Sequence, residues 1–319
     1  MGRRVTVVLI TWNSAPYLRR CLDGIARQTH PDIELINVDN ASADHSAQRV
    51  LEAFPHCRQI INSTNRGFAA AANQAIRTAS GDFVALCNPD AFLTAEYLSR
   101  IVAAFDQGGE NFGAATGKLM RARGEDIEPT DAIDSMGIRM TRSGRHLDIQ
   151  LSGVGSQFSE VFGVSGAAAV YRKSCIIDVT INNEYFDEDF FAYREDADVA
   201  WRARLFGWRA MVVPEAIAYH VRTVTPERRR SLSPEINMHS VKNRFLLRLK
   251  NEGAYLAVRN APFELARDLM VIGAALTIER SSFPALQWLW RNRRRILEKR
   301  REVQKRRRVS DRRLAEWFR

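Results

Sequence analysis

The first hundred residues alternate regularly between strand-like and helix-like segments, and this alternation restricts the fold more than any other feature of the sequence. Short apolar runs predict strands at residues 5–10, 33–38, 58–61 and 83–86. Apolar residues spaced three and four apart predict helices at residues 15–27, 43–54, 67–78 and 96–105. Alternation at this spacing favours an α/β fold, in which a parallel, doubly wound sheet carries helices on both faces.

The rest of the chain is less regular. Residues 108–165 are rich in glycine and predict irregular strands and loops, residues 164–171 predict a buried strand, and residues 186–208 predict a loop that leads into a helix. A helical stripe covers residues 236–250, and the chain after Pro262 is predicted to be helical and increasingly basic. We therefore expect one domain at residues 1–250 and a helical, basic C-terminal extension at residues 251–319.

The composition is that of a chain that can bury a core without disulfides, with 319 residues of which 45% are hydrophobic. The four cysteines are far apart and lack the Cys-x-x-Cys spacing of metal or redox sites, so we expect buried free thiols in a reducing compartment. The apolar run at residues 5–10 is too short for a signal peptide. The run at residues 269–278 is about half of the roughly 20 residues that a membrane-spanning helix needs.

The positive charge is concentrated at the C-terminus. The chain carries a formal net charge of +10, and the residues from Arg280 onward include 15 Lys/Arg and 4 Asp/Glu, so the preceding part is close to neutral. Aromatic and aliphatic residues are interleaved with these arginines, a pattern that suits an anionic membrane surface. They are Trp288, Leu289, Trp290, Ile296, Leu297, Trp317 and Phe318. A solvated helix or a self-association surface is the alternative interpretation.

Polar residues follow the predicted strands, at the sheet edge where doubly wound proteins bind ligands. Asp39 could bind a nucleobase or ribose, or could instead form an Asx turn that starts the next helix. Gly67 opens a helix whose free N–H groups could bind a phosphate, although a plain loop-to-helix junction would look the same. Asp90, in Asn88-Pro89-Asp90, could hold a divalent cation that neutralises a diphosphate, or could belong to an ordinary turn.

A second cluster of charged residues lies at residues 190–208. Glu195, Asp196 and Asp198 place three carboxylates within four residues, and their repulsion should raise the pKa of at least one of them. Such a carboxylate is a suitable general base for a sugar hydroxyl. The other interpretation is that the acids favour the N-terminus of a helix. His220, which ends another predicted strand, is expected to matter only if the fold brings it near Asp90.

Taken together, these segments resemble family 2 glycosyltransferases of the GT-A fold, in particular their bacterial rhamnosyltransferase-like branch. The resemblance runs from Val5 to about Lys250, and no single motif is specific, whereas this many in this order is highly specific. The motifs are VVLITWNS, INVDNASAD, NRGFAAAANQAI, GDFVALCNPDAFL, VSGAAAVYRK and FDEDFFAYREDADVAWRARLFGWRAMVVPEAIAYH. The resemblance implies a doubly wound mixed sheet with a nucleotide-sugar-binding half and an acceptor half.

The resemblance also implies roles for particular residues. The donor contacts are expected at Thr11, Asn13, Asp39, Asn65, Gly67, Asn88 and Asp90. The family's Asp-x-Asp metal motif falls on Asn88-Pro89-Asp90, where asparagine replaces the first acid, so the expected ligands of Mg²⁺ or Mn²⁺ are Asp90 and His220. The catalytic base falls on Glu195 or Asp196, of which we favour Asp196. The residues expected on the acceptor side are Gly166, Asp198, Trp201 and Arg202.

The reaction that this resemblance implies is an inverting single displacement, in which Asp196 deprotonates the acceptor hydroxyl. Deoxythymidine-diphosphate-rhamnose (dTDP-rhamnose) is the first expected donor, with uridine-diphosphate sugars next. The expected acceptor is a lipid-linked or polysaccharide glycan of the cell envelope. The protein would act in the cytoplasm, peripheral on the inner face of the cell membrane, with a homo-oligomer as a further expectation.

Two other function classes stay open. One is a catalytically inactive relative that binds the donor or serves as a scaffold, against which the intact acidic cluster speaks. The other is a nucleic-acid-binding protein that uses the basic tail. The near-neutral body and the lack of a recognised nucleic-acid-binding motif argue against this second class, so no nucleic-acid partner is expected.

Overall fold

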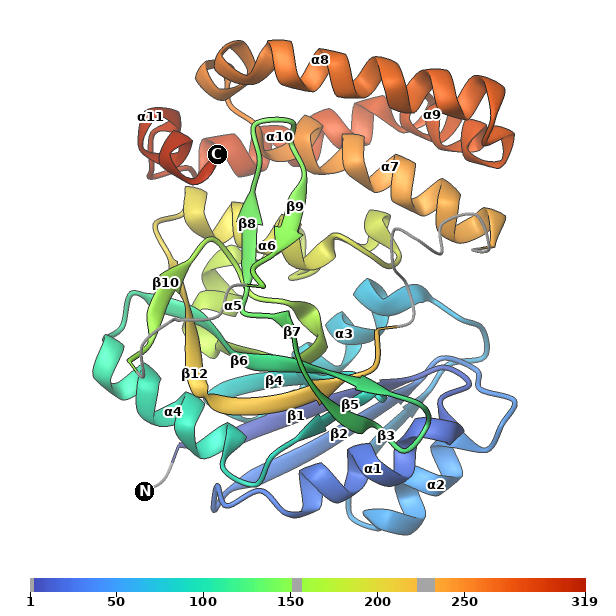
Figure 1. Ribbon diagram of the computed structural model, residues 1–319, viewed down its shortest axis with the longest axis vertical. Coiled ribbons are helices and arrows are strands. Elements are labelled where there is room, and N and C mark those ends of the chain that lie inside the picture. Colours follow the sequence, from blue (N-terminus) through green and yellow to red (C-terminus); the bar gives the residue numbers. More distant parts are fainter. Residues whose placement is uncertain (1–2, 151–156, 223–232) are drawn as a thin grey trace.

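The computed structural model describes residues 3–150, 157–222 and 233–319. Figure 1 shows an α/β body below a layer of C-terminal helices, which are coloured orange to red. The strands are β1 (Val5–Thr11), β2 (Ile33–Asp39), β3 (Arg58–Ile61), β4 (Phe83–Cys87), β5 (Ala91–Leu93), β6 (Phe112–Arg123), β7 (Glu128–Ser135), β8 (Ile138–Met140), β9 (His146–Asp148), β10 (Ser159–Val161), β11 (Ala169–Arg172) and β12 (Arg209–His220). The α-helices are α1 (Ala15–Ala26), α2 (Ser46–Ala53), α3 (Gly67–Thr78), α4 (Tyr97–Gly108), α5 (Lys173–Val179), α6 (Glu195–Leu205), α7 (Pro234–Asn251), α8 (Ala254–Thr277), α9 (Phe283–Arg291), α10 (Arg293–Lys305) and α11 (Asp311–Leu314).

The large sheet is mixed, with the order β10-β12-β6-β11-β4-β1-β2-β3. Strands β4, β1, β2 and β3 run parallel, as the alternation of the first hundred residues predicts. Strand β11 is antiparallel to both β4 and β6, which makes the sheet mixed. Strands β8 and β9 form a separate hairpin. The predicted α/β class with a doubly wound mixed sheet is confirmed.

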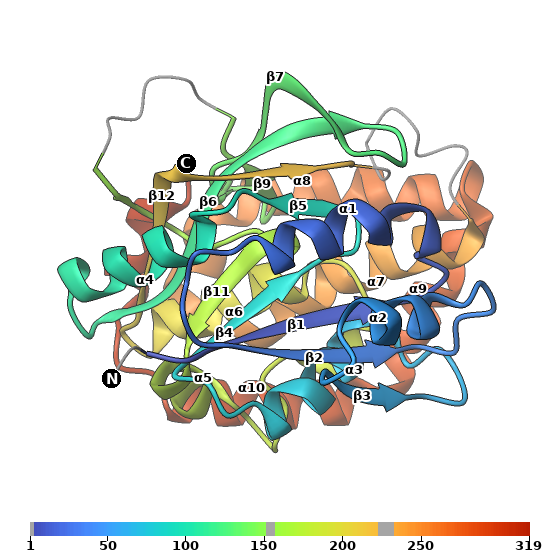
Figure 2. The ribbon, with the colours of Figure 1, turned by 90° about the horizontal axis from the view of Figure 1, so that it is seen from below.

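Helices cover both faces of the sheet because the side chains of its strands alternate between two cores. In β1, Val5, Val7 and Leu9 pack with residues of α1, α2 and α4. Val8 points the other way and packs with residues of α3, α5 and α6. Figure 2 shows α1 and α2 in front of the sheet and the C-terminal helices behind it. The sheet therefore lies between two packed layers of helices.

Several predicted boundaries differ from the structure. Helix α2 begins at Ser46, not at residue 43, because the preceding turn contains two residues with positive φ, Ala41 and His45. The strand predicted at residues 164–171 is interrupted by a 3₁₀ turn, Gly166–Ala168, before β11. Helix α8 begins at Ala254 and continues through Pro262, so the C-terminal helices start earlier than predicted.

The C-terminal extension shares a core with the rest of the chain. Leu256, Ile296, Val303 and Phe318 belong to the same hydrophobic cluster as the sheet residue Val8. The division into domains at residue 250 stays a prediction, but the extension is not a loosely solvated tail. Apolar residues of α8, α10 and the C-terminus thus pack against the body.

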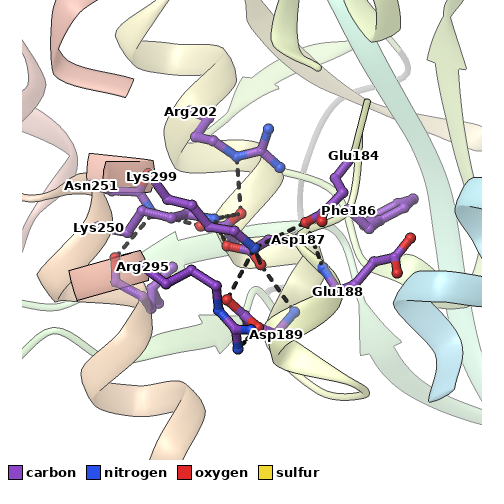
Figure 3. A network of polar contacts seen from close by, with 12 residues as sticks. Glu184, Phe186, Asp187, Glu188, Asp189, Arg202, Lys250, Asn251, Arg295 and Lys299 are labelled. Atoms are coloured by element: carbon purple, nitrogen blue, oxygen red, sulfur yellow. Dashed lines mark hydrogen bonds and ion pairs between the residues drawn. The ribbon is translucent and has the colours of Figure 1, made fainter. Parts of the chain in front are cut away.

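A buried ion-pair network also fixes this layer (Figure 3). Lys250 of α7 lies 2.6 Å from Asp187 and 2.7 Å from Asp198 of α6. Lys299 of α10 contacts Asp187 and lies 3.0 Å from both Glu184 and Asp189, and Arg295 pairs with Asp189. Burial opposes ionisation of Asp187, but Lys250 and Lys299 hold the pKa of its carboxyl well below its usual range. Part of the basic charge predicted to face a membrane is thus neutralised inside the protein.

The cysteines and the helix lengths bear on two sequence expectations. All four cysteines are free, and Cys21, Cys87 and Cys175 are buried. Among the described residues, no single helix is long and apolar enough to cross a membrane. Helix α8 together with residues 280–291 has sufficient length and composition, but this pair is bent by 109°.

Candidate active site

The ends of β1 and β2 are joined by side-chain hydrogen bonds. The Thr11 hydroxyl donates to Asp39 Oδ2 at 2.8 Å, and the backbone N–H of Ser42 donates to Asp39 Oδ1 at 2.8 Å. Asn13 Oδ1 accepts from the backbone N–H of Ala43 at 2.8 Å. Asp39 therefore organises the turn, as the Asx-type interpretation requires, although the helix begins four residues beyond Ser42. A carboxylate has further lone pairs, but Asp39 is only 2% exposed and Thr11 is fully buried, so a contact between either side chain and the donor stays a prediction.

The start of α3 differs from the sequence prediction. The N–H of Gly67 donates to Asn65 Oδ1 at 2.9 Å, and the N–H of Ala69 donates to the carbonyl of Phe191 at 3.0 Å. These N–H groups are not free for a phosphate, so the predicted phosphate cradle is wrong at these two positions. Gly67 has a φ of 80°, and a Cβ there would lie 2.5 Å from the Phe191 ring. The glycine is needed for close packing and a left-handed conformation.

His220 and Asp90 come together, as the sequence interpretation required. Strand β12 pairs with β5, and this pairing sets His220 opposite Ala91. The Nε2 atom of His220 lies 3.5 Å from Asp90 Oδ1. Its Nδ1 lies 2.9 Å from Oδ2 of the buried Asp134. Burial opposes protonation of His220, but Asp134 and Asp90 outweigh it and raise the pKa of the imidazole to about 9.

Asp134 was missed by the sequence analysis. It lies 86 residues from His220 in the chain, and no local motif marks it. Its buried carboxylate also lies 2.9 Å from Arg222, which in turn lies 2.7 Å from Asp148. An acid that accepts the Nδ1–H of a histidine fixes the tautomer and directs Nε2 toward a ligand. Asp134 is therefore positioned to orient His220 toward Asp90.

Glu195 and Asp196 occupy the first turn of α6, beside Gly166. Asp196 Oδ2 accepts from the N–H of Gly166 at 3.2 Å, and its Oδ1 accepts from the N–H of Ala197 at 2.7 Å. Burial raises the pKa of Asp196 above its ordinary value, although these two hydrogen bonds oppose the shift. Burial, with a smaller contribution from the Asp196 charge, raises the pKa of Glu195 to about 8. Like-charge repulsion thus acts as predicted, but burial is the larger cause.

The two acids therefore differ in what they can do at neutral pH. Glu195 is buried, and its Oε2 has no hydrogen-bond partner among the residues that the structure describes, so its protonated form is favoured. Asp196 is less buried and has backbone donors that stabilise its charged form. In coupled carboxyl pairs, one group holds the proton while the other stays ionised. This asymmetry favours Asp196 as the base.

The strand ends and α6 meet at a single edge. The backbone N–H of Asn88 donates to the carbonyl of Ala167 at 2.9 Å, next to Gly166. A Cβ added to Gly166 would lie 3.7 Å from Asp196 Oδ2 and 4.0 Å from Glu195 Oε1. Asn88 and Asp90 are both partly exposed. The 88–90 segment, Gly166 and the two acids of α6 thus form one continuous site.

Three residues predicted on the acceptor side are instead structural. Asp198 and Trp201 are fully buried, and Arg202 is almost so. Asp198 pairs with Arg202 at 2.9 Å and with Lys250, on the side of α6 turned away from Asp196. The Trp201 ring packs against Phe318 with their centroids 4.9 Å apart. The acceptor-side prediction is wrong for these three residues because the inward face of α6 joins the C-terminal layer.

A strained loop, residues 191–194, leads into α6. Phe191, Tyr193 and Arg194 have φ values of 64°, 70° and 71°, a conformation that costs free energy for residues with a side chain. Burial raises the pKa of Tyr193, and the charges of Glu195 and Asp90 add to this shift. The sequence analysis gave this loop no role, since strain of this kind leaves no mark in sequence.

Asn243 of α7 holds this loop in place. Its buried Nδ2 lies 2.9 Å from the carbonyl of Phe190, 2.8 Å from that of Ala192 and 2.7 Å from that of Tyr193. Compensating hydrogen bonds are what allow a strained segment to persist at a functional site. A helix outside the sheet thus fixes the backbone next to Glu195.

The residues present fit a divalent cation held partly by substrate. Asp90 offers a carboxylate, and His220 would offer its oriented Nε2 on losing the proton that Asp90 and Asp134 stabilise. Mg²⁺ or Mn²⁺ is commonly held by one or two side chains plus diphosphate oxygens. Within the described parts of the chain, no group of three or more His, Cys, Asp or Glu residues is arranged to hold a metal. The protein ligands would therefore be these two.

Comparisons with known proteins identify the family. The family model described as Glycosyl transferase family 2 matches residues 6–180. Glycosyltransferase GlyA of Streptococcus pneumoniae is 30% identical over 100 residues, which are 31% of this chain and 14% of that protein. N-acetylglucosaminyl-diphospho-decaprenol L-rhamnosyltransferase of Mycobacterium tuberculosis is 23% identical over 241 residues, which are 67% of this chain and 75% of that protein.

A solved structure shares the fold at low sequence identity. GalNAc-T7, solved with UDP, GalNAc and Mn²⁺, superposes with a TM-score of 0.63 at 11% identity. The match covers 78% of this chain and 48% of that one. The chain thus spans less than half the length of both this protein and GlyA.

Proposed function

The chain belongs to glycosyl transferase family 2, has the GT-A fold and is a glycosyltransferase, and from this premise we propose that it is an inverting enzyme whose base is Asp196. The donor, a nucleoside diphosphate sugar, binds along Thr11, Asn13, Asp39 and Asn88-Pro89-Asp90. The observation that carries this proposal is the position of Asp196 and Gly166 beside the 88–90 segment. It puts an ionisable carboxylate next to the place where a donor diphosphate would end.

The proposed reaction is a single displacement. Asp196 accepts the proton of an acceptor hydroxyl while the hydroxyl oxygen attacks the anomeric carbon of the donor. The bond from that carbon to the diphosphate oxygen breaks, and the nucleoside diphosphate leaves with the bonding electrons. Protonated Glu195 adds no negative charge beside the base. The N–H of Gly166 holds the carboxylate of Asp196 in position as the charge on it changes.

A divalent cation belongs to this proposal. Asp90 and His220 would hold it, and when bound it would neutralise charge that develops on the leaving diphosphate. Asp134 supports this role by accepting the Nδ1–H of His220. The structural neighbour solved with UDP and Mn²⁺ supports the same type of cofactor.

dTDP-rhamnose is the proposed donor, with uridine-diphosphate sugars next, and a lipid-linked or polysaccharide glycan is the proposed acceptor. The support is the partial similarity to a rhamnosyltransferase whose name gives a decaprenyl-linked acceptor. The test is a thermal-shift panel of nucleotide sugars with and without Mn²⁺, followed by transfer assays with the donor that stabilises best. Stabilisation by dTDP-rhamnose alone is expected. Stabilisation by a uridine-diphosphate sugar alone would replace the donor, and no response to any nucleotide sugar would overturn the proposal.

A further inference from the structure

The exposed face of helix α8 is apolar, whereas an ordinary surface helix exposes its polar face. Across residues 254–278, all of which the structure describes, the exposed positions include no charged residue. Its larger exposed side chains are Tyr255, Val258, Phe263, Leu265, Leu269, Met270, Leu276 and Ile278. An amphipathic helix that packs on a soluble body normally turns such residues inward. A contiguous apolar face of this kind marks an interaction surface.

The polar residues of α8 fix this orientation. Glu264 pairs with Arg248 of α7 at 3.0 Å, and Asp268 pairs with both Arg248 and Arg244. Asn260 of α8 is fully buried. Rotating the helix to bury its leucines would break these ion pairs and leave charges without partners. The apolar face is therefore held outward by the fold.

Helix α8 is also the outermost element of the C-terminal layer, on the side farthest from the sheet (Figure 1). Its outward face is therefore clear of the strand ends that carry the candidate active site. A large flat partner could contact this face without blocking that site.

Basic and aromatic side chains lie beyond the C-terminal end of α8. Arg280, Arg291, Arg293 and Arg294 are exposed. Trp290 is 69% exposed, and the guanidinium of Arg293 lies over its ring, 4.4 Å from the centroid. Of the tail residues predicted to anchor a membrane, only Trp290 and Leu297 are largely exposed. Phe318 and Ile296 are buried in the core, so the predicted anchor moves from the tail to α8.

We propose that α8 lies in the surface of an anionic lipid bilayer, with its leucines among the acyl chains and the arginines of 280–294 at the headgroups. An interfacial helix needs one apolar face and basic flanks, not the length of a membrane-spanning segment. We favour a bilayer over a second copy of this chain because the exposed arginines next to the apolar face match anionic headgroups, whereas a contact between two apolar faces makes no use of them. The proposal does not depend on which sugar or acceptor the enzyme uses.

The test is flotation of the full chain with vesicles of phosphatidylcholine, alone or mixed equally with phosphatidylglycerol. Wild type is expected to float with the anionic vesicles. Leu265→Glu/Leu269→Glu should lower the partition coefficient by roughly tenfold or more, because it removes two apolar side chains from the interface. Ile177→Glu is the matched control, since Ile177 on α5 is 68% exposed and Leu269 is 72% exposed. Replacing Arg291, Arg293 and Arg294 with glutamine should weaken binding to the anionic vesicles by about fivefold per arginine.

Unchanged melting temperatures are required of each variant, so that lost flotation does not reflect unfolding. The proposal is overturned if wild type does not float, or if the double variant floats as well as Ile177→Glu. It is also overturned if sedimentation shows a dimer that the double variant dissociates, since α8 would then pair with a second copy. Flotation requires no catalytic turnover, so failure of the proposed reaction would leave this result unaffected.

Discussion

The backbone N–H of Gly166 donates a hydrogen bond of 3.2 Å to Oδ2 of Asp196, and this contact joins the sheet to the first turn of α6. It fixes the Asp196 carboxylate beside Gly166, whose neighbour Ala167 accepts a hydrogen bond from the N–H of Asn88. The donor is a backbone N–H, and a Cβ added at position 166 would lie 3.7 Å from Asp196 Oδ2.

Asp196→Asn should abolish transfer while leaving the fold intact. The amide cannot accept a proton from the acceptor, and loss of a general base costs about 10²–10⁴-fold in rate. The measurement is kcat for sugar transfer, together with the thermal shift caused by the donor, which should be retained. Asp106→Asn, at an exposed position in α4, serves as the control. An active Asp196→Asn enzyme would remove Asp196 from the proposed role.

Glu195→Gln should change how stability depends on pH. The pKa of Glu195 is about 8 in the folded protein and ordinarily 4.5, so the native state retains a proton that the unfolded chain releases between these values. The contribution of this group to stability is complete below pH 4.5 and is lost as the pH rises toward 8. Glutamine has no such proton to lose. The melting temperature of the variant minus that of wild type should therefore increase from pH 4.5 to 8; a constant difference would contradict the raised pKa.

Lys250→Met should destabilise the protein strongly. Lys250 is 2% exposed and lies between Asp187 and Asp198, so its removal leaves buried carboxylates undercompensated. Breaking a buried ion pair by deleting one partner costs about 3–5 kcal/mol. Denaturant unfolding measures this loss, with Lys305→Met at an exposed position of α10 as the control. Similar losses in the two variants would show that the network does not anchor the C-terminal helices.

Asn243→Ala should slow transfer more than it weakens donor binding. It removes the hydrogen bonds that hold the strained loop before Glu195, and misplacement of a catalytic group by about 1 Å can cost about 10²-fold in rate. The readouts are kcat and the donor-induced thermal shift. Asn237→Ala, at another buried asparagine of α7, is the matched control. If both variants lose kcat equally, a general weakening of α7 explains the effect.

His220→Ala should remove the stabilisation by Mn²⁺ in the presence of a nucleoside diphosphate. The variant deletes one of the two side chains that converge at the proposed cation site. The measurement is the melting temperature with and without Mn²⁺, which does not depend on turnover. His56→Ala, at an exposed position, should keep the full shift. A full shift in His220→Ala would place the cation elsewhere.

The sequence predicted the alternating elements well because each strand and helix carries its own periodic pattern. It also placed Asp39 and Asp90 at one edge, since parallel strands end together. Motif order went further and indicated the family, including the position of Glu195 and Asp196. These features are local, or depend on the order of local features, so a single chain reveals them.

Only the tertiary structure decided which residues, distant in sequence, contact the predicted site residues. Asp134 orients His220 from 86 positions away, and Asn243 holds a loop that is about 50 residues earlier in the chain. The carbonyl of Phe191 accepts the N–H of Ala69 at the start of α3, where the sequence predicted a phosphate site.

The C-terminal region shows the same division. Composition determined that residues after 280 are basic, and apolar spacing determined that they are helical. Packing determines which charged residues are buried. A buried acid such as Asp187 requires a cation beside it, whereas an exposed acid does not. Lys250 and Lys299 are therefore buried beside acids. Most leucines of α8, in contrast, are exposed.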